Sequence, residues 1–141
     1  MSEIKKVDET IAAGGQPTPE DLQQLAAEGF KSVINLRFPD ETGFLSDEQQ
    51  QAEVAGLKYA HIPLKSTEAD DERTAKVLSE LEALPTPVYF HCGLGGRANA
   101  LALIAFATRN KLNREEVLVK AQELGINTEQ PSLKQFLESL S

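Results

Sequence analysis

The segment Val88-Tyr-Phe-His-Cys-Gly-Leu-Gly-Gly-Arg-Ala-Asn-Ala100 decides how the chain is organised. Its beginning is largely apolar, which is typical of a buried strand, and its glycine-rich middle predicts a loop. Residues 98–109 are apolar on nearly every side, which predicts a buried helix. The segment therefore predicts a strand, a loop and a helix in direct succession. The chain's one cysteine, Cys92, opens the loop, and Arg97 closes it.

Strands and helices are expected to alternate along the rest of the chain. Apolar runs predict further strands at residues 7–12, 31–36 and 58–64, each followed by a stretch with helical spacing. After residue 98 the pattern indicates helices only. This alternation is typical of a mainly parallel sheet of four or five strands flanked by helices. We expect one α/β domain over residues 1–141.

The composition excludes several classes of protein. The chain has 141 residues, of which 40% are hydrophobic, and a net charge of −8, which argues against nucleic acid or an anionic membrane as partner. One cysteine and two histidines allow neither an internal disulfide nor a cysteine-based zinc site, and no metal or organic cofactor is implied. The start of the chain has no signal-peptide pattern, and its apolar runs are too short to span a bilayer. We expect a cytoplasmic protein.

The glycine-rich loop has the composition of an oxyanion cradle. Gly93, Gly95 and Gly96 allow the backbone to curl with its N–H groups pointing inward, and the following helix adds a partial positive charge at its N-terminus. The same environment favours the thiolate form of Cys92, which is the nucleophilic form. Arg97 can bind two phosphate oxygens with its planar fork.

These residues resemble a known family. The run His91-Cys-Gly-Leu-Gly-Gly-Arg97 resembles the protein-tyrosine-phosphatase signature, His-Cys-x-x-Gly-x-x-Arg, and residues 10–15 and 29–36 are similar to segments of small dual-specificity phosphatases. The usual signature has five residues between cysteine and arginine, whereas this chain has four. The shorter loop, with Gly-Gln-Pro-x-x-Glu-Asp-Leu upstream and Val-Ile-Asn-Leu-Arg after it, resembles the phosphatase-like domain of the beta-lactamase hydrolase-like family. The resemblance covers most of residues 7–110.

The resemblance implies a cysteine-phosphatase fold and a cysteine-dependent phosphatase that acts on a phosphorylated protein or small molecule, with phosphotyrosine as one candidate. Cys92 would attack phosphorus and form a phosphocysteine, and His91 would hold the loop. The phosphate would be bound by Gly93, Leu94, Gly95, Gly96 and Arg97.

The general acid is expected on the loop after the strand at residues 58–64. The resemblance favours Asp70, with Glu68 and Asp71 as alternatives. These carboxylates could equally belong to the first turn of a helix. Arg37 could likewise help to form an anion pocket or be an ordinary ion-pairing arginine.

Two alternatives remain open. Ala98 stands where the family usually has Ser or Thr, whose hydroxyl assists the leaving sulfur, so the domain could bind phosphate without turning it over. The four-residue spacing also matches the loop of rhodanese-like sulfurtransferases, in which the cysteine, here Cys92, would carry a persulfide.

Overall fold

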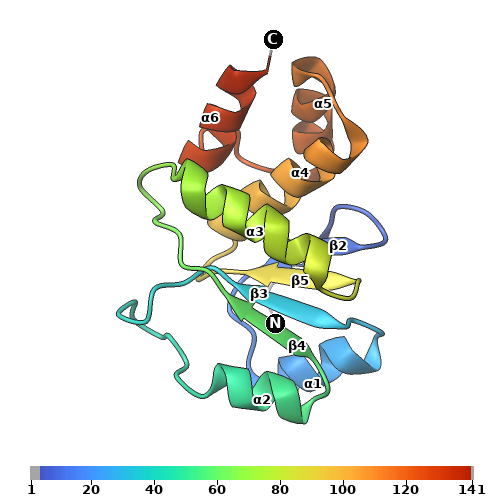
Figure 1. Ribbon diagram of the computed structural model, residues 1–141, viewed down its shortest axis with the longest axis vertical. Helices are drawn as coiled ribbons and strands as arrows, with labels where there is room; N and C mark the ends of the chain where they lie inside the picture. Colours follow the sequence, from blue (N-terminus) through green and yellow to red (C-terminus); the bar gives the residue numbers. More distant parts are fainter. Residues whose placement is uncertain (1–3, 141) are drawn as a thin grey trace.

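Five strands form one sheet in the computed structural model, which describes residues 4–140. Their spatial order is β1-β2-β5-β3-β4, and their bounds are Lys5–Lys6 (β1), Ile11–Gly14 (β2), Ser32–Asn35 (β3), Lys58–His61 (β4) and Val88–His91 (β5). β5 pairs in parallel with β2 and β3, β3 pairs in parallel with β4, and β1 is antiparallel to β2. The predicted mainly parallel sheet is therefore confirmed, and β5 lies at its centre (Figure 1).

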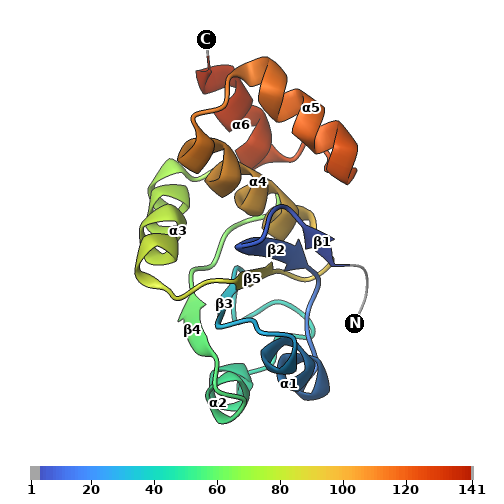
Figure 2. The same ribbon diagram turned by 90° about the vertical axis from the view of Figure 1, so that its right-hand side faces the viewer.

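Helices cover both faces of this sheet (Figures 1 and 2). One face carries α1 (Pro19–Ala27) and α2 (Glu48–Val54), and the other carries α3 (Asp71–Ala83) and α4 (Gly96–Asn110). α5 (Arg114–Leu124) and α6 (Pro131–Ser139) lie farther from the sheet and pack against α4. None of the helices within residues 4–140 is long and apolar enough to cross a bilayer.

The core is divided by the sheet into two apolar clusters. Successive strand residues point to opposite faces, so each central strand contributes to both clusters. Val33 and Tyr89 pack with α1 and α2, whereas Ile34 and Phe90 pack with α4. Because both faces are covered, every residue of β2, β3 and β5 is buried, as is usual for parallel strands.

The first strand differs from the prediction. Residues 7–12 were expected to form one strand, but the structure has a turn between β1 and β2. Asp8 causes it, because its carboxylate accepts hydrogen bonds from the backbone N–H groups of Thr10 (2.8 Å) and Ile11 (2.9 Å). The Asp8 carboxylate thus satisfies backbone N–H groups that a neighbouring strand would otherwise bind, and the chain turns back between β1 and β2.

Candidate active site

The loop between β5 and α4 has the predicted arrangement. β5 ends at His91, and α4 begins at Gly96 after Gly95, whose φ of 109° lies in the left-handed region. A residue with a side chain adopts that conformation only at a cost, so glycine is needed there for the turn. The turn places the N-terminus of α4 over the end of the central strand, where parallel α/β sheets commonly bind ligands.

Backbone N–H groups converge on the sulfur of Cys92. Its Sγ accepts hydrogen bonds from the N–H of Gly95 (3.2 Å) and of Ala98 (3.4 Å). Hydrogen bonds that donate to sulfur stabilise its anionic form more than its neutral form. The loop therefore directs two backbone donors toward this sulfur.

A pocket of about 370 Å³ opens beside this sulfur. Its lining residues come from four separate parts of the chain and are Glu41, Ser66, Cys92, Gly93, Leu94, Gly96, Arg97 and Gln130. Leu94 is fully exposed at its rim, whereas Cys92 is 1% exposed. The pocket thus holds the thiol and one guanidinium, with an exposed leucine at its rim.

The Arg97 guanidinium is held by a carboxylate that the sequence analysis did not single out. Nη1 and Nη2 donate to the two oxygens of Glu41 at 2.7 and 2.9 Å, and Nη1 also donates to the Leu64 carbonyl at 2.9 Å. The hydrogen bonds with Glu41 raise the pKa of Arg97. The side chain is thereby fixed before any ligand arrives.

Glu41 is ionised in this arrangement. Its hydrogen bond with Arg97 outweighs the effect of burial and lowers its pKa to about 2, with further support from the N–H of Phe38 and from Arg37. A carboxyl group with so low a pKa carries no proton at neutral pH, so Glu41 cannot serve as a general acid while it contacts Arg97. In the sequence, the position of Glu41 four residues after Arg37 is the only sign that Glu41 pairs with an arginine.

Arg37 organises the loop that carries Glu41. The side chain is buried, and it donates to the side chain of Gln16 (2.8 Å) and to the carbonyls of Thr42 (2.5 Å) and Gly43 (3.2 Å). It also lies beside the Cys92 loop, because a Cβ on Gly93 would stand 3.9 Å from its guanidinium carbon. Arg37 is not among the residues that line the Cys92 pocket, and it pairs with Glu41 (3.2 Å), so of the two roles considered the structure supports ion pairing.

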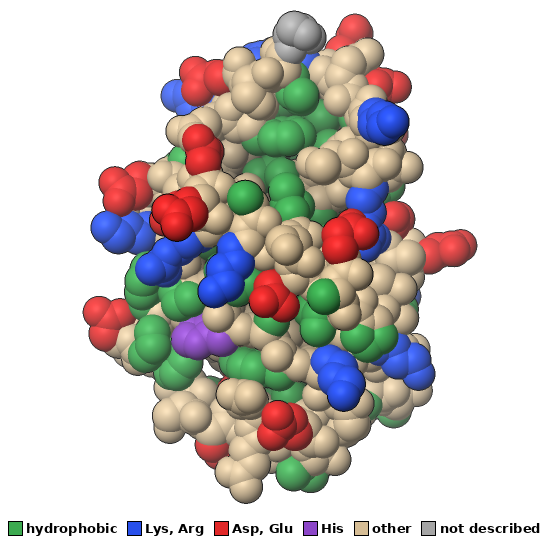
Figure 3. Space-filling view, in the orientation of Figure 1, with side chains coloured by type: hydrophobic (Ala, Val, Ile, Leu, Met, Phe, Trp, Pro, Cys, Tyr) green, Lys and Arg blue, Asp and Glu red, His purple; other side chains and the backbone are tan. Residues whose placement is uncertain are grey.

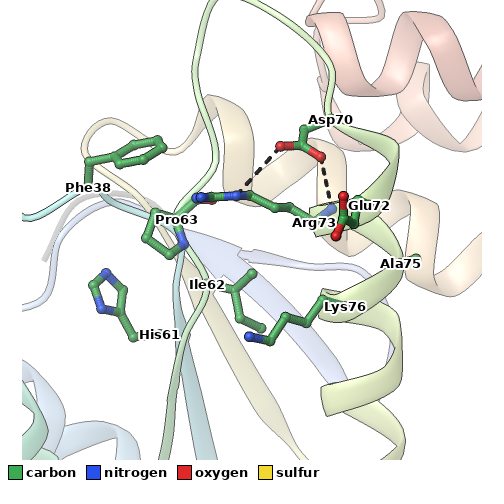
Figure 4. A pocket seen from close by; sticks show the side chains of 9 residues that line it. All are labelled: Phe38, His61, Ile62, Pro63, Asp70, Glu72, Arg73, Ala75 and Lys76. Atoms are coloured by element: carbon green, nitrogen blue, oxygen red, sulfur yellow. Dashed lines mark hydrogen bonds and ion pairs between the residues drawn. The ribbon is translucent and has the colours of Figure 1, made fainter.

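Asp70 lies elsewhere. It is the N-cap of α3, where its carboxylate accepts from the N–H of Arg73 (3.0 Å) and pairs with that arginine's Nε (3.6 Å). It lines a second pocket, of about 870 Å³, together with Phe38 and His61 (Figure 4). This pocket belongs to the face drawn in Figure 3, where a histidine lies below a group of Lys and Arg side chains. Asp70 is not among the residues that line the Cys92 pocket.

The two alternative acids also have partners outside the Cys92 pocket. Glu68 pairs with Lys65 (3.0 Å), and Asp71 accepts a hydrogen bond from Gln135 of α6. Within the described chain, Ser66 is the residue of this loop that reaches the pocket of Cys92. In the present arrangement the loop therefore contributes Ser66 to the pocket but no carboxylate.

Gln130 brings the C-terminal helices into the pocket. The sequence analysis assigned no chemistry to residues 110–141, yet Gln130 caps α6 through its Oε1, which accepts from the N–H of Leu133 (3.1 Å). Its Nε2 is buried and has no hydrogen-bond partner within residues 4–140. A buried donor without a partner is costly, so this amide is suited to a ligand oxygen in the pocket. In the sequence, the position of Gln130 before Pro131 is typical of a helix start and gives no sign of a part in the site.

The fold and the matched family define a phosphatase-like α/β domain. Residues 3–109 match the family described as beta-lactamase hydrolase-like protein, phosphatase-like domain, and the chain belongs to this family. A beta-lactamase hydrolase-like protein of Agrobacterium fabrum is 34% identical over 119 residues, which are 79% of this chain and 27% of that protein. The chain thus spans about a quarter of the length of this relative.

Solved structures of phosphatases share the fold. Tk-PTP in its active form is 22% identical, with a TM-score of 0.79 over 99% of each chain. A Cys-to-Ser variant of P. aeruginosa TpbA, solved in complex with pTyr, is 15% identical, with a TM-score of 0.74 over 98% of this chain and 84% of that one. The expected family and fold are therefore confirmed.

Proposed function

We propose that this domain hydrolyses phosphomonoesters through a phosphocysteine intermediate on Cys92. The observation that carries the proposal is the convergence of two backbone N–H groups on Sγ, in a pocket that also holds the fixed guanidinium of Arg97. A nucleophile and an oxyanion-binding group at one point are what phosphoryl transfer requires. Membership of a phosphatase-like family favours this chemistry over sulfur transfer.

The reaction would proceed in two displacements. Sγ attacks phosphorus, the S–P bond forms, and the P–O bond to the leaving alcohol breaks, with its electron pair remaining on the leaving oxygen, which takes up a proton. Water then attacks the phosphocysteine and gives a proton to the same carboxylate that protonated the leaving oxygen, and the S–P bond breaks to restore the thiolate and release phosphate. The backbone N–H groups of residues 93–97, with the side chains of Arg97 and Gln130, would bind the phosphoryl oxygens.

The proton for the leaving alcohol is assigned to Asp70, on the loop after β4. For this role the carboxylate has to leave the N–H of Arg73 and turn toward the Cys92 pocket. The Asp70→Asn variant tests whether the carboxylate makes this rearrangement.

An aryl phosphate such as phosphotyrosine is the substrate class that we favour. The exposed Leu94 offers an apolar contact at the rim of the pocket, and the structurally similar TpbA variant was solved with pTyr.

A phosphate-binding module without turnover is the second candidate. Its support is Ala98, which donates to Sγ through its N–H but has no hydroxyl to assist the leaving sulfur.

Hydrolysis of p-nitrophenyl phosphate by the wild type and by Cys92→Ser, from acidic to neutral pH, tests the proposal. We expect turnover by the wild type and a loss of at least about a thousandfold in the variant. Binding of inorganic phosphate, measured by calorimetry on both proteins, separates the two candidates. Phosphate binding without turnover by the wild type would establish the binding module, and turnover that survives in Cys92→Ser would exclude Cys92 as the nucleophile.

A further inference from the structure

The pocket of about 870 Å³ that contains His61 lies outside the Cys92 pocket, and the two have no lining residue in common. We call it the outer pocket. It lies between the end of β4, the first turns of α3 and the loop after β3, and Phe38, Ile62, Pro63, Arg73 and Lys76 are among its lining residues (Figure 4). Its position beside the candidate active site raises the question of what it binds.

A short stretch of extended backbone separates the two pockets. Nη1 of Arg73 donates to the carbonyl of Pro63 at 2.7 Å, and Nη1 of Arg97 donates to the carbonyl of Leu64 at 2.9 Å. Carbonyl groups of consecutive residues in an extended chain point to opposite sides. The two arginines therefore contact the same stretch from its two sides, with Arg97 in the Cys92 pocket and Arg73 in the outer pocket.

The outer pocket follows the free edge of the sheet. β4 is the last strand in the spatial order, and the N–H groups of Lys58 and Ile62 donate to carbonyls on the β3 side, each at 2.9 Å. Because backbone groups alternate in direction along a strand, the N–H and C=O groups of His61 point away from β3. An open strand edge of this kind can pair with an extended peptide.

Two cations line the outer pocket without a matching number of paired acids. Arg73 and Lys76 are three positions apart on α3, so they are neighbours on one face of the helix and repel each other. Asp70 pairs with Arg73 at 3.6 Å, but within residues 4–140 Lys76 has no ion pair, and Figure 4 shows its amino group pointing toward Ile62. An anionic group between the two cations would offset their repulsion.

The Arg73 guanidinium is held in place while part of it remains available. Nη1 is bound to the Pro63 carbonyl, Nε faces Asp70, and the guanidinium lies 5.3 Å from the centre of the Phe38 ring. Nη2 makes no hydrogen bond within the part of the chain that the structure describes, and the side chain is 42% exposed. Nη2 can therefore donate to a ligand oxygen without losing the contacts that fix the side chain.

The other wall of the outer pocket is rigid and partly apolar. Nε2 of His61 donates to the carbonyl of Arg37 at 2.6 Å, and the ring lies 5.4 Å from that of Phe44. Ile62 is buried and Phe38 is half-buried, so both present carbon atoms below the two cations. Such a pocket suits a side chain with an apolar stem and a carboxylate end, which is the chemistry of glutamate.

The two pockets are close enough for one peptide to occupy both. Pro63 lines the outer pocket and Ser66 lines the Cys92 pocket, and three residues of extended chain span at most about 10 Å. An extended peptide covers the same distance in about three residues. A phosphorylated side chain in the Cys92 pocket therefore places a residue within about three positions of it at the outer pocket.

We propose that the outer pocket binds an acidic side chain of an extended protein segment whose phosphotyrosine occupies the Cys92 pocket. Arg73 and Lys76 bind the carboxylate, and the free edge of β4 binds the backbone of the segment. The chain has a net charge of −8, so it repels acidic segments in general and attracts one only where cations are grouped locally. The inference deepens the proposed function, because it rests on a phosphorylated protein as the substrate.

The test is the affinity of two phosphotyrosine peptides for the Cys92→Ser protein, measured by fluorescence anisotropy. One peptide has three glutamates on each side of the phosphotyrosine, and the other has glutamines at the same positions. We expect the acidic peptide to bind about three- to tenfold more tightly. Adding Lys76→Glu should abolish this preference. Adding Lys58→Glu, the same change of charge at an exposed position at the other end of β4, should retain it.

The inference is overturned if neither peptide binds, if the two bind equally, or if the preference survives Lys76→Glu. Lys76 is exposed, so its replacement should leave the fold intact. As a second readout, p-nitrophenyl phosphate is small enough to need the Cys92 pocket alone. With Cys92 restored, Lys76→Glu should keep kcat/KM for this substrate within about twofold of the wild type. An equal loss for this substrate and for the acidic peptide would contradict a separate pocket.

The outcome can be separated from that of the proposed function. A wild type that does not hydrolyse p-nitrophenyl phosphate, although Cys92→Ser prefers the acidic peptide through Lys76, would reject hydrolysis and retain the outer pocket as a peptide-binding site. Hydrolysis of p-nitrophenyl phosphate without any preference between the peptides would retain the phosphatase and reject the outer pocket.

Discussion

The loop after β5 and the loop after β4 leave the same edge of one sheet, but they differ in how their polar groups are directed. In the loop after β5, backbone N–H groups and the Arg97 guanidinium are directed toward one pocket beside Cys92. In the loop after β4, each acid contacts a partner outside that pocket. Under the proposed mechanism, the comparison means that Cys92 and the anion-binding groups are in place in the unliganded domain, whereas the supply of a proton by Asp70 requires a change of conformation.

Arg97→Lys tests the preorganised loop and has the largest expected effect after that of Cys92→Ser. Lysine retains the charge but loses the planar fork that contacts Glu41 and the Leu64 carbonyl. We expect kcat/KM for p-nitrophenyl phosphate to fall by about 10² to 10³ and phosphate binding to weaken in calorimetry. Arg109→Lys, at an arginine far from the pocket, is the control. Activity within a few-fold of the wild type would show that the fork is not used.

Asp70→Asn tests the loop after β4. Asparagine also caps a helix, so α3 should remain intact. If Asp70 is the general acid, kcat should fall by up to about a hundredfold for an alkyl phosphate and far less for p-nitrophenyl phosphate, whose leaving group needs no proton. The decline of kcat at higher pH, where a general acid loses its proton, should also disappear. Equal kcat values and pH profiles for the variant and the wild type would remove Asp70 from the mechanism.

Glu41→Gln tests how the Arg97 side of the pocket is held. The pKa of Glu41 is lowered from 4.5 to about 2, so its contribution to stability is present above pH 4.5 and is lost as the pH falls through about 2. We expect the variant to be less stable at pH 6, by about 1 to 2 kcal/mol, and the difference to shrink as the pH approaches 2. Urea unfolding at several pH values measures it, with Glu53→Gln as the control. A difference that is independent of pH would contradict the ion pair.

Ala98→Ser has the smallest expected effect. The new hydroxyl would lie beside Sγ, as in the resembling phosphatases, and should assist the sulfur as the phosphocysteine is hydrolysed. We expect the steady-state rate to rise about two- to fivefold while the burst of p-nitrophenol stays the same, in rapid-mixing experiments. Ala100→Ser, buried on the same helix, serves as the comparison. A slower second step in Ala98→Ser would show that the shorter loop has replaced this hydroxyl by other means.

Much of the fold could be predicted because its determinants are local. The spacing of apolar residues predicts the elements, and Gly29, Gly56 and Gly125 lie at positive φ just after the ends of α1, α2 and α5. The exception at residues 7–12 also has a local cause, since the Asp8 side chain makes the turn. A strand prediction based on apolar content does not register that carboxylate.

The partners of the site residues could not be predicted in the same way. Glu41 is 56 residues from Arg97, and Glu48 is 43 residues from His91. They meet because β3 pairs with β5, so the chain that leaves β3 passes beside the Cys92 loop. Gln130 reaches the pocket only because α6 packs against α4.

By itself, the sequence determined the family, the mainly parallel sheet and the composition of the loop from Cys92 to Arg97, because glycine content and apolar spacing act within a few residues. The tertiary structure alone decided which carboxylates contact Arg97 and His91 and where Asp70 points. Hydrogen bonds and ion pairs depend on distance and direction to within a fraction of an ångström. Such geometry arises only when elements distant in the sequence are packed together.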